Sequence, residues 1–391
     1  MSFHGVRVVD LTRVISGPFC SALLADLGAD VIKVEPLGQG DPVRAQGVMV
    51  GEMSSYFANY NRNKRSIALD LYAPEGKEIL ADLLVGADVL VENFRPDVLG
   101  KMGFPAERLK QINPALIHCN INGFGANGPY AERPAFDLIV QAMSGFMSCN
   151  GTADEPPMRS GVPIADLVCG LYAALGVAAA LHGRAPQSGG ASVQVSMLAS
   201  LMSMLSFHAT NYLNSGEVAP RTGNDHAIVC PYGLFATADG EIAIAPSNDA
   251  IYAKLVKALD LEERLAAPAF ATNASRIARR GEVNAIIEAR TKTASSAHWI
   301  DVLNRAGVPC GPVYGVGQAF DDPQVRSQKI AAQTEFAGRP IGVLASPILL
   351  DGLKSAPRLP PPGLGEHTET VLREIGCDDG RLAELRAKGV I

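Results

Sequence analysis

The sequence lacks the excess of basic residues that nucleic-acid-binding proteins usually carry. Its 391 residues include 34 Lys and Arg against 40 Asp and Glu, which gives a formal net charge of −6. Because binding along a phosphate backbone needs clustered positive charge, we expect no nucleic-acid partner. The balance does not exclude a small anionic ligand, which a local basic pocket can hold in an acidic protein.

Paired cysteines are missing as well. The seven cysteines are scattered and odd in number, and none lies in a CxxC motif. This pattern favours neither a disulfide framework nor a zinc site. We therefore expect reduced thiols in a reducing compartment and no metal site.

The sequence also lacks a secretory signal and a long hydrophobic run. Residues 1–9 do not show a basic segment followed by an extended apolar stretch. The longest uncharged stretch, residues 167–183, is rich in Gly and Ala and is shorter than the ~20 apolar residues that cross a bilayer. We expect a buried helix there, no membrane partner and a cytoplasmic protein.

The first third of the chain alternates strand and helix signals. Apolar, β-branched runs predict strands at residues 6–10, 30–35, 87–91 and 115–121, and helical patterns occur at 19–27 and at 74–85, where Pro74 opens the helix. Strands that alternate with helices of about 10–15 residues are typical of βαβ units around a parallel sheet. The sequence thus predicts a Rossmann-like α/β domain.

The glycine-rich dinucleotide fingerprint GxGxxG does not follow the first strand. Residues 12–18 read TRVISGP instead. A single Gly and a Pro at a helix start still predict a turn whose free backbone N–H groups face an anion. An ordinary strand-to-helix turn is an equally good interpretation of these seven residues.

The pattern changes after residue 210. A hairpin is predicted at residues 234–245 around Asp239-Gly240, and helices are predicted at 251–259, 282–290 and 296–306. These elements predict a smaller α+β domain. Beyond residue 338, Pro, Gly and short apolar runs lead to a last predicted helix at 368–375.

Asp166 stands where a helix begins. Gly161 and Pro163 oppose a helix before it, and the residues after it favour one. The usual role of Asp at such a place is to cap the helix, and the local sequence favours that role. The same position also suits a nucleophile, because helix-end N–H groups and the helix dipole favour an ionised carboxylate.

A set of motifs follows in a fixed order along the whole chain. The motifs include residues 10–13 (DLTR), 17–18 (GP), 24–35 (LADLGADVIKVE), 63–66 (NKRS), 92–96 (ENFRP), Asp137, Gln141, the Gly161/Pro163/Asp166/Gly170 segment and residues 363–368 (GLGEHT). With them the chain resembles the family III CoA-transferases (CaiB/BaiF family), a group that includes formyl-CoA transferase and carnitine CoA-transferase.

The resemblance implies a covalent role for Asp166. In this family the matching aspartate attacks an acyl-CoA thioester, gives a mixed anhydride and then an aspartyl-CoA thioester, and passes CoA to a second acid. The oxyanion is expected to be stabilised by backbone N–H groups in the turn at Ile15, Ser16 and Gly17. No metal or redox cofactor is needed, and coenzyme A is a substrate.

The resemblance also implies where CoA binds. The residues that match the family's nucleotide site are Leu69, Asn93, Phe94, Lys101 and Met102. Tyr72 and Pro36 stand where formyl-CoA transferase has a lysine and an arginine. A cationic cluster at residues 61–65 is a candidate replacement for those charges, and a solvated face is the other interpretation.

Two more departures concern the acid substrates. Formyl-CoA transferase has a glutamine where this chain has Ile15, and a glycine-rich lid where residues 224–228 read NDHAI. Formyl-CoA and oxalate are therefore not expected as substrates. The less polar turn suits a larger acid, and dicarboxylates or their methyl-branched relatives are the first expectation. His226, in that loop, is a candidate contact for the acceptor acid.

Three other functions stay open at this point. An α-methylacyl-CoA racemase shares the fold and the aspartate but needs a second proton carrier, and Phe136 occupies the place of its histidine. His118 and His226 are weaker substitutes. An acyl-CoA hydrolase and a non-catalytic CoA-binding protein are the remaining alternatives.

Family members are homodimers of interlinked chains, so the resemblance implies a homodimer. It also implies that residues 1–210 and 330–391 form the large domain and residues 220–325 the small one. The linkers would lie at 210–225 and 322–345. Composition alone shows none of this.

Overall fold

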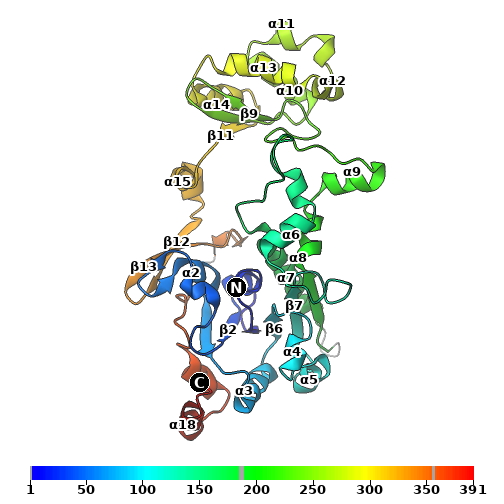
Figure 1. Ribbon diagram of the computed structural model, residues 1–391. Helices are drawn as coiled ribbons and strands as arrows, with labels where there is room; N and C mark the ends of the chain where they lie inside the picture. The colour runs from blue at the N-terminus through cyan, green and yellow to red at the C-terminus, as the bar shows by residue number, and fades with distance from the viewer. Residues whose placement is uncertain (1, 185–188, 355–356) are drawn as a thin grey trace. The chain divides into compact units, whose positions relative to one another are not determined.

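The computed structural model describes residues 2–184, 189–354 and 357–391. The chain divides into two units (Figure 1). Unit 1 contains Met1–Phe146, Ser160–Ser206 and Pro323–Ile391, and unit 2 contains Met147–Arg159 and Phe207–Asp322. Residues 147–159, which we expected in the large domain, therefore group with unit 2.

Unit 1 is built on a six-stranded parallel sheet. Its strands are β1 (Arg7–Asp10), β2 (Asp30–Glu35), β5 (Lys64–Ala68), β6 (Val89–Glu92), β7 (Ile117–Asn122) and β8 (Ser192–Ser196). Their order in the sheet is β5-β2-β1-β6-β7-β8, with every neighbouring pair parallel. Counted along the chain this is the order 3-2-1-4-5-6 of doubly wound nucleotide-binding folds. The predicted α/β architecture with a parallel sheet is confirmed.

Helices cover both faces of this sheet. Val9, Ile32 and Leu90 belong to the hydrophobic cluster that also contains side chains of α3, α17 and α18. Their neighbours along the strands belong to a second cluster, shared with α1 and α7. Because successive strand residues point to opposite faces, both faces are buried, which is why these strands read as continuous apolar runs.

The helices of unit 1 agree with the predicted ones where the pattern was strong. They are α1 (Ser16–Asp26), α2 (Ser55–Asn61), α3 (Pro74–Val85), α4 (Val98–Lys101), α5 (Ala106–Ile112), α6 (Asp137–Met143), α7 (Ile164–His182), α8 (Met197–Ser203), α16 (Pro323–Ser327), α17 (Thr368–Glu374) and α18 (Asp379–Ala387), with a 3₁₀ turn at Pro42–Ala45. A second 3₁₀ turn, Phe146–Cys149, begins in unit 1 and continues into unit 2. The helix predicted at 368–375 is α17, but it is not the last. The helix α18 follows it and lies beside α3 (Figure 1), where Lys388 Nζ donates to Glu75 at 2.6 Å.

Small antiparallel pairs complete unit 1. They are β3 (Met49–Val50) with β4 (Met53–Ser54), β12 (Ala331–Phe336) with β13 (Arg339–Leu344), and β14 (Leu349–Leu350) with β15 (Leu353–Lys354). The β12–β13 pair packs on α2 through Ile341, Val343 and Phe57. The C-terminal part of the chain thus returns to the N-terminal sheet domain.

The helix α7 is long and apolar enough to cross a membrane by length and composition alone. The core helix of a globular domain meets the same criteria, and Cys169, Ala173 and Val177 of α7 are buried in the cluster shared with α1 and the sheet. The expectation of a buried helix holds for this face of α7 only, since Leu171 and Leu175, one turn apart, are 51% and 64% exposed in the described chain.

Two ion pairs are completely buried beside the sheet. Lys64 Nζ lies 3.1 Å from Asp10 Oδ2 and also donates to Ser21 and Asn61. Lys33 Nζ lies 3.0 Å from an oxygen of Asp41. Burial opposes ionisation of Asp10, yet the two lysines and hydrogen bonds lower its pKa to about 2, so it stays charged.

The charged side chains of the cationic cluster at residues 61–65 form ion pairs within the protein. Lys64 is buried as described above, Arg62 pairs with Asp26 at 2.5 Å, and Arg65 pairs with Asp30 at 2.7 Å. Neither a phosphate-binding patch nor a solvated face describes these side chains. Their charge balances carboxylates of the neighbouring strands and helices instead.

Unit 2 contains a three-stranded antiparallel sheet, in the order β11-β10-β9. Its strands are β9 (Gly233–Ala236), β10 (Glu241–Ile244) and β11 (Cys310–Pro312), and its helices are α9 (Phe207–Ser215), α10 (Asp249–Ala258), α11 (Glu262–Leu265), α12 (Asn273–Ala278), α13 (Arg280–Thr291), α14 (Ser296–Arg305) and α15 (Val316–Asp321), with a 3₁₀ turn at Pro268–Phe270. The predicted hairpin at 234–245 is confirmed by the pairing of β9 with β10. Its core contains Phe235, Leu255, Ile287 and Trp299.

Replacing Lys64 by Met tests the buried pair. The substitution leaves the Asp10 carboxylate buried without its cation, so we expect the free energy of unfolding to fall by about 3–5 kcal/mol. The matched control is Lys292→Met, which removes an exposed pair with Glu288 and should cost less than about 1 kcal/mol. Urea unfolding followed by circular dichroism measures both, and equal losses would contradict the assignment.

Candidate active site

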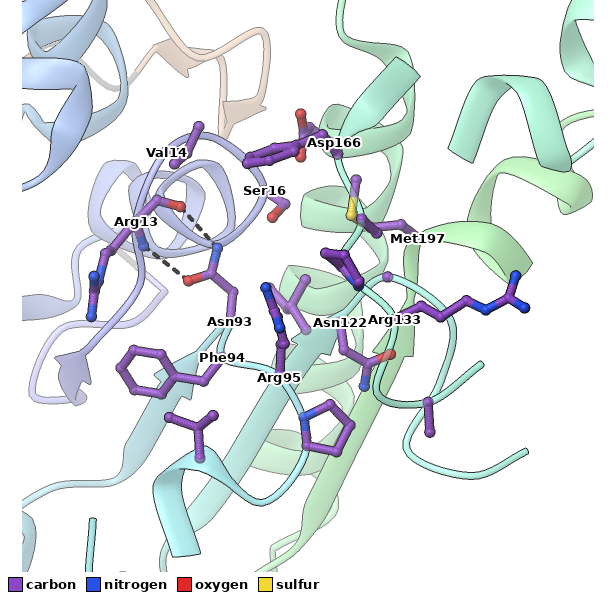
Figure 2. Close-up of a pocket in the computed structure, with 18 residues that line it drawn as sticks. Arg13, Val14, Ser16, Asn93, Phe94, Arg95, Asn122, Arg133, Asp166 and Met197 are labelled. Atoms are coloured by element: carbon purple, nitrogen blue, oxygen red, sulfur yellow. Dashed lines mark hydrogen bonds between the residues drawn. The ribbon is translucent and has the colours of Figure 1, made fainter. Parts of the chain in front are cut away.

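A cavity of about 500 Å³ opens in unit 1 where strands β1, β6 and β7 end (Figure 2). Its walls come from the segments that follow these strands, from the segment before α6, and from Asp166 and Met197. The strand order reverses between β1 and β6, and ligands of doubly wound folds bind in the crevice at that reversal, outside the carboxyl ends of the strands. The position of the cavity is the one that the fold predicts.

The turn after β1 is held in a strained form. Val14, a β-branched residue, has a φ of 69°, in the left-handed region that such residues rarely adopt. Its N–H donates to the buried carboxylate of Asp41 at 3.2 Å. On the other side, the Asn93 side chain donates to the carbonyl of Arg13 at 2.8 Å and accepts from its N–H at 2.9 Å (Figure 2). The turn is therefore fixed from two sides, and α1 begins at Ser16.

Glycine at position 170 lets α7 approach α1. A Cβ atom there would lie 2.6 Å from the carbonyl oxygen of Ser16, closer than real Cβ contacts allow. Gly17 is equally restricted, since its Cβ would lie 2.3 Å from Thr12 Cβ. The close approach at Gly170, one helical turn after Asp166, brings Ser16 and Asp166 to the same cavity.

Asp166 occupies the first turn of α7 but does not cap it. The helix begins at Ile164, and its N-terminus has no side-chain cap from the preceding residue, Pro163. Instead, Asp137 of α6 accepts a hydrogen bond from the N–H of Ala165 at 2.9 Å. Because another residue satisfies this N–H group, the Asp166 side chain is left to face the cavity.

Gln141 orients the carboxylate that caps α7. Its Nε2 donates to Asp137 Oδ2 at 2.6 Å, and its Oε1 accepts from the Ser160 N–H at 2.8 Å. Asp137 and Gln141 are both buried, and Gln141 is completely so. Gln141 therefore links the segment before α7, at Ser160, to Asp137, the residue that caps the helix.

The Asp166 carboxyl has a pKa raised to about 7. Burial raises this pKa most, the negative charge of Asp137 raises it further, and a hydrogen bond from Ser16 lowers it. The expectation that the helix start keeps this carboxylate fully ionised is wrong. Loss of water and a neighbouring carboxylate outweigh the first-turn N–H groups. Near neutral pH the side chain exists as both carboxylate and carboxylic acid.

A second cavity of about 510 Å³ shares a wall with the first. Arg13, Phe94 and Val98 line both cavities. Of the residues predicted to bind CoA, the second cavity contains Leu69, Phe94, Lys101 and Met102, and the first contains Asn93 and Phe94. The structure therefore brings all five together along one connected surface, and Pro36, Tyr72 and Lys77 also line its second part.

Comparison with known proteins identifies the family. The sequence matches the model of CoA-transferase family III over residues 3–368. The chain belongs to this family. It is 38% identical to succinate–glutarate CoA-transferase of Agrobacterium fabrum, over 95% of each chain, and 36% identical to human succinyl-CoA:glutarate CoA-transferase, over 99% of this chain and 89% of the relative. A CaiB/BaiF family protein from Brucella suis has the same fold, with a TM-score of 0.84, 37% identity and coverage of 95% and 98%.

This family III CoA-transferase presents Phe136 at the first cavity. Phe136 precedes α6, is 70% exposed and lines the wall that also contains Asp166. A phenyl ring carries no titratable group, so it can contact an acyl chain but cannot exchange a proton with it. The argument from Phe136 against a racemase stays a prediction.

Ile15 was expected in the active-site turn that faces the substrate, but Val14 takes that place. Ile15 is buried in the protein interior, whereas Val14 lines the cavity. The left-handed backbone at Val14 turns that side chain outward. Ser16 also lines the cavity, and Gly17 lies buried behind it.

His226 belongs to unit 2 of the enzyme. Its ring stacks on Phe207 at 5.3 Å between centroids and contacts Tyr232 at 4.9 Å. Burial, together with the positive charge of Arg280 and the nearby His208, lowers its pKa. Its role toward the acceptor acid stays a prediction.

Sequence reasoning did not single out several residues that shape the site. Tyr56 and Tyr60 of α2 have raised pKa values, chiefly through burial, and the charge of Asp166 contributes to both. Both hydroxyls therefore stay protonated at neutral pH. Arg95 and Asp137 were part of the matched motifs, but only folding shows that one faces the cavity and the other caps α7.

Replacing Asp137 by Asn separates its charge from its hydrogen bond. The amide oxygen can still accept from the Ala165 N–H, but the negative charge beside Asp166 is gone. We expect the pKa of Asp166 to fall below about 7, so the acidic limb of the kcat/KM profile for CoA transfer should move to lower pH. An unchanged profile with normal folding would show that Asp137 does not act on the charge of Asp166.

Proposed function

We propose that this enzyme transfers CoA from an acyl-CoA donor to a dicarboxylic acid through covalent intermediates on Asp166. The proposal is based on the position of Asp166, which does not cap its helix and lines a cavity together with Ser16. This cavity shares a wall with the predicted CoA-binding surface. The two relatives compared above are named for succinate and glutarate, which supports a dicarboxylate acceptor.

The reaction would begin with attack of an Asp166 oxygen on the thioester carbonyl of the donor. The C–S bond breaks, which leaves an acyl-aspartyl anhydride and the CoA thiolate. The thiolate then attacks the aspartyl carbonyl, and the first carboxylate leaves. Asp166 now carries CoA as a thioester, and no net proton transfer has been needed.

The second half of the reaction runs in the reverse sense. A carboxylate oxygen of the acceptor attacks the aspartyl-CoA carbonyl and expels the thiolate, which gives a new anhydride. The thiolate attacks the acceptor's acyl carbon, and Asp166 leaves as a carboxylate. Because only the ionised form can attack, a pKa of about 7 means that the reactive fraction of Asp166 rises through neutral pH.

The tetrahedral intermediates of these steps carry an oxyanion. The first N–H groups of a helix lack partners within the helix, and the first turn of α1 presents Ser16 to the cavity. We propose that these N–H groups, with the Ser16 hydroxyl, stabilise the oxyanion. Donors fixed in place before reaction are effective in a partly dry site.

The second cavity would hold the nucleotide of CoA. Lys77, Lys101 and Arg13 supply positive charge for its phosphates, and Leu69 and Met102 supply apolar walls. Lys77 and Arg13 thus compensate for the positions where Tyr72 and Pro36 replace basic residues. Coenzyme A is a substrate here, and we propose no further cofactor.

A homodimer and a cytoplasmic location are part of the proposal. The helices α6, α7 and α8 contact one another and expose apolar side chains, which are Leu138, Ile139, Met143, Leu171, Leu175 and Met202. Extended exposed apolar surface is typical of interfaces, and a second copy of the chain would cover it. The mass in solution, measured by light scattering, tests this.

Trapping of the intermediates tests the reaction. Incubation with an acyl-CoA donor and hydroxylamine should convert Asp166 to a hydroxamate, because both the anhydride and the thioester react with this nucleophile. Mass spectrometry of peptides should place the modification at Asp166, and Asp166→Asn should lose both the modification and transferase activity. Full transferase activity in that variant, or modification elsewhere only, would exclude the mechanism.

A further inference from the structure

Three arginines line the cavity that contains Asp166, namely Arg13, Arg95 and Arg133. Within residues 2–184, 189–354 and 357–391, none of the three forms an ion pair, whereas other arginines of unit 1, such as Arg44 and Arg65, pair with carboxylates at 2.6–2.7 Å. A guanidinium is always charged at neutral pH and its donors match a carboxylate. Three such groups around an open cavity indicate anionic ligands.

The three arginines differ in where they lie. Arg13 lies over the Phe94 ring at 5.4 Å and lines both cavities, so it is placed for the CoA phosphates. Arg133 lies over the Tyr130 ring at 3.7 Å, and Figure 2 shows it at the edge of the cavity, directed outward.

Arg95 lies inside the cavity. Figure 2 shows its side chain between Asn93 and Asn122, directed toward Ser16. It follows Phe94 at the end of β6, where the strand order of the sheet reverses. Of the three cations, it is therefore the one placed to meet the part of a ligand that enters between the nucleotide surface and Asp166.

Arg95 and Asp166 share the cavity without neutralising each other. The groups that act on the Asp166 carboxylate are Asp137 and Ser16, and no arginine of the described chain is among them. In the view of Figure 2, Ser16 lies between the Arg95 side chain and the Asp166 carboxylate. A ligand with two anionic ends joined by a short carbon chain fits that arrangement, and Ile121 and Met197 offer apolar walls between the ends.

We propose that Arg95 binds the far carboxylate of a dicarboxylic acid while the near carboxylate reacts at Asp166. This proposal rests on the proposed function, and it assigns the selectivity for the acceptor acid to the side chain of Arg95. Arg95 is a specificity-determining residue in this account, and it takes no part in bond making. A monocarboxylic acid of equal length would leave the guanidinium without its partner.

Arg95→Gln tests the assignment through matched pairs of acceptors. Succinate and butyrate have the same chain length and differ by one carboxylate, as do glutarate and valerate. In a ping-pong reaction kcat/KM for the acceptor does not depend on the donor, so it isolates this step. We expect Arg95→Gln to lower kcat/KM for the two diacids roughly 10- to 100-fold, and for the monoacids less than about 3-fold.

Two variants serve as controls. Arg95→Lys keeps a positive charge and should restore part of the preference for diacids. Arg108→Gln removes an arginine that lies over the Phe104 ring and lines neither cavity, so it should change all four values by less than about 3-fold.

The outcomes separate this proposal from the proposed function. Equal losses for diacids and monoacids, or no loss for either, would overturn the role of Arg95 while transfer itself continues. Failure of the wild-type enzyme to transfer CoA to any of the four acids would contradict the proposed function. Transfer to the monoacids alone would contradict the dicarboxylate acceptor and Arg95's role together.

Discussion

The site depends on how closely α1 and α7 approach each other. At Gly170 the backbone of α7 lies so near the Ser16 carbonyl that no side chain fits between them. That contact brings together two helix starts, one with Ser16 and one with Asp166. The strained turn at Val14 leads directly into α1, and hydrogen bonds with Asp41 and Asn93 hold this turn. The buried ion pair with Lys33 in turn fixes the Asp41 carboxylate.

Asp137 has two opposing effects at the start of α7: it fixes the position of the first turn, and it disfavours the charged form of Asp166. Asp137 fixes the first turn of α7 because a carboxylate is a strong acceptor for its N–H groups. The same negative charge, with burial, raises the pKa of Asp166 to about 7. Asp166 is thus held in a fixed position and is partly protonated at neutral pH.

The pattern of apolar residues in the sequence predicts those strands and helices whose side chains are buried. Strand β2 was found with its observed bounds because both its faces are buried, whereas β5 begins with Lys64 and Arg65, whose charges hide a strand that is folded into the interior. The edge strand β8 has polar residues at alternate positions, so the search for apolar runs did not predict it either.

The site was predictable only in part. Local sequence favours a capping role for Asp166, and only the resemblance pointed to chemistry. The true cap, Asp137, comes from 28 residues earlier, a distance that no local pattern spans. Val14 lines the cavity in place of Ile15 because its own backbone is left-handed, and the direction of the Arg95 side chain is set only in the folded chain.

Oxygen exchange into Asp166 is the most direct test of its covalent role. When an acceptor acid labelled with ¹⁸O in its carboxylate reacts through the anhydride, the bridging oxygen comes from the acid and stays on Asp166 when the thiolate attacks the acyl carbon. The account predicts that turnover makes the peptide containing Asp166 heavier by one and then two ¹⁸O atoms. Sustained turnover with no ¹⁸O in that peptide would contradict it.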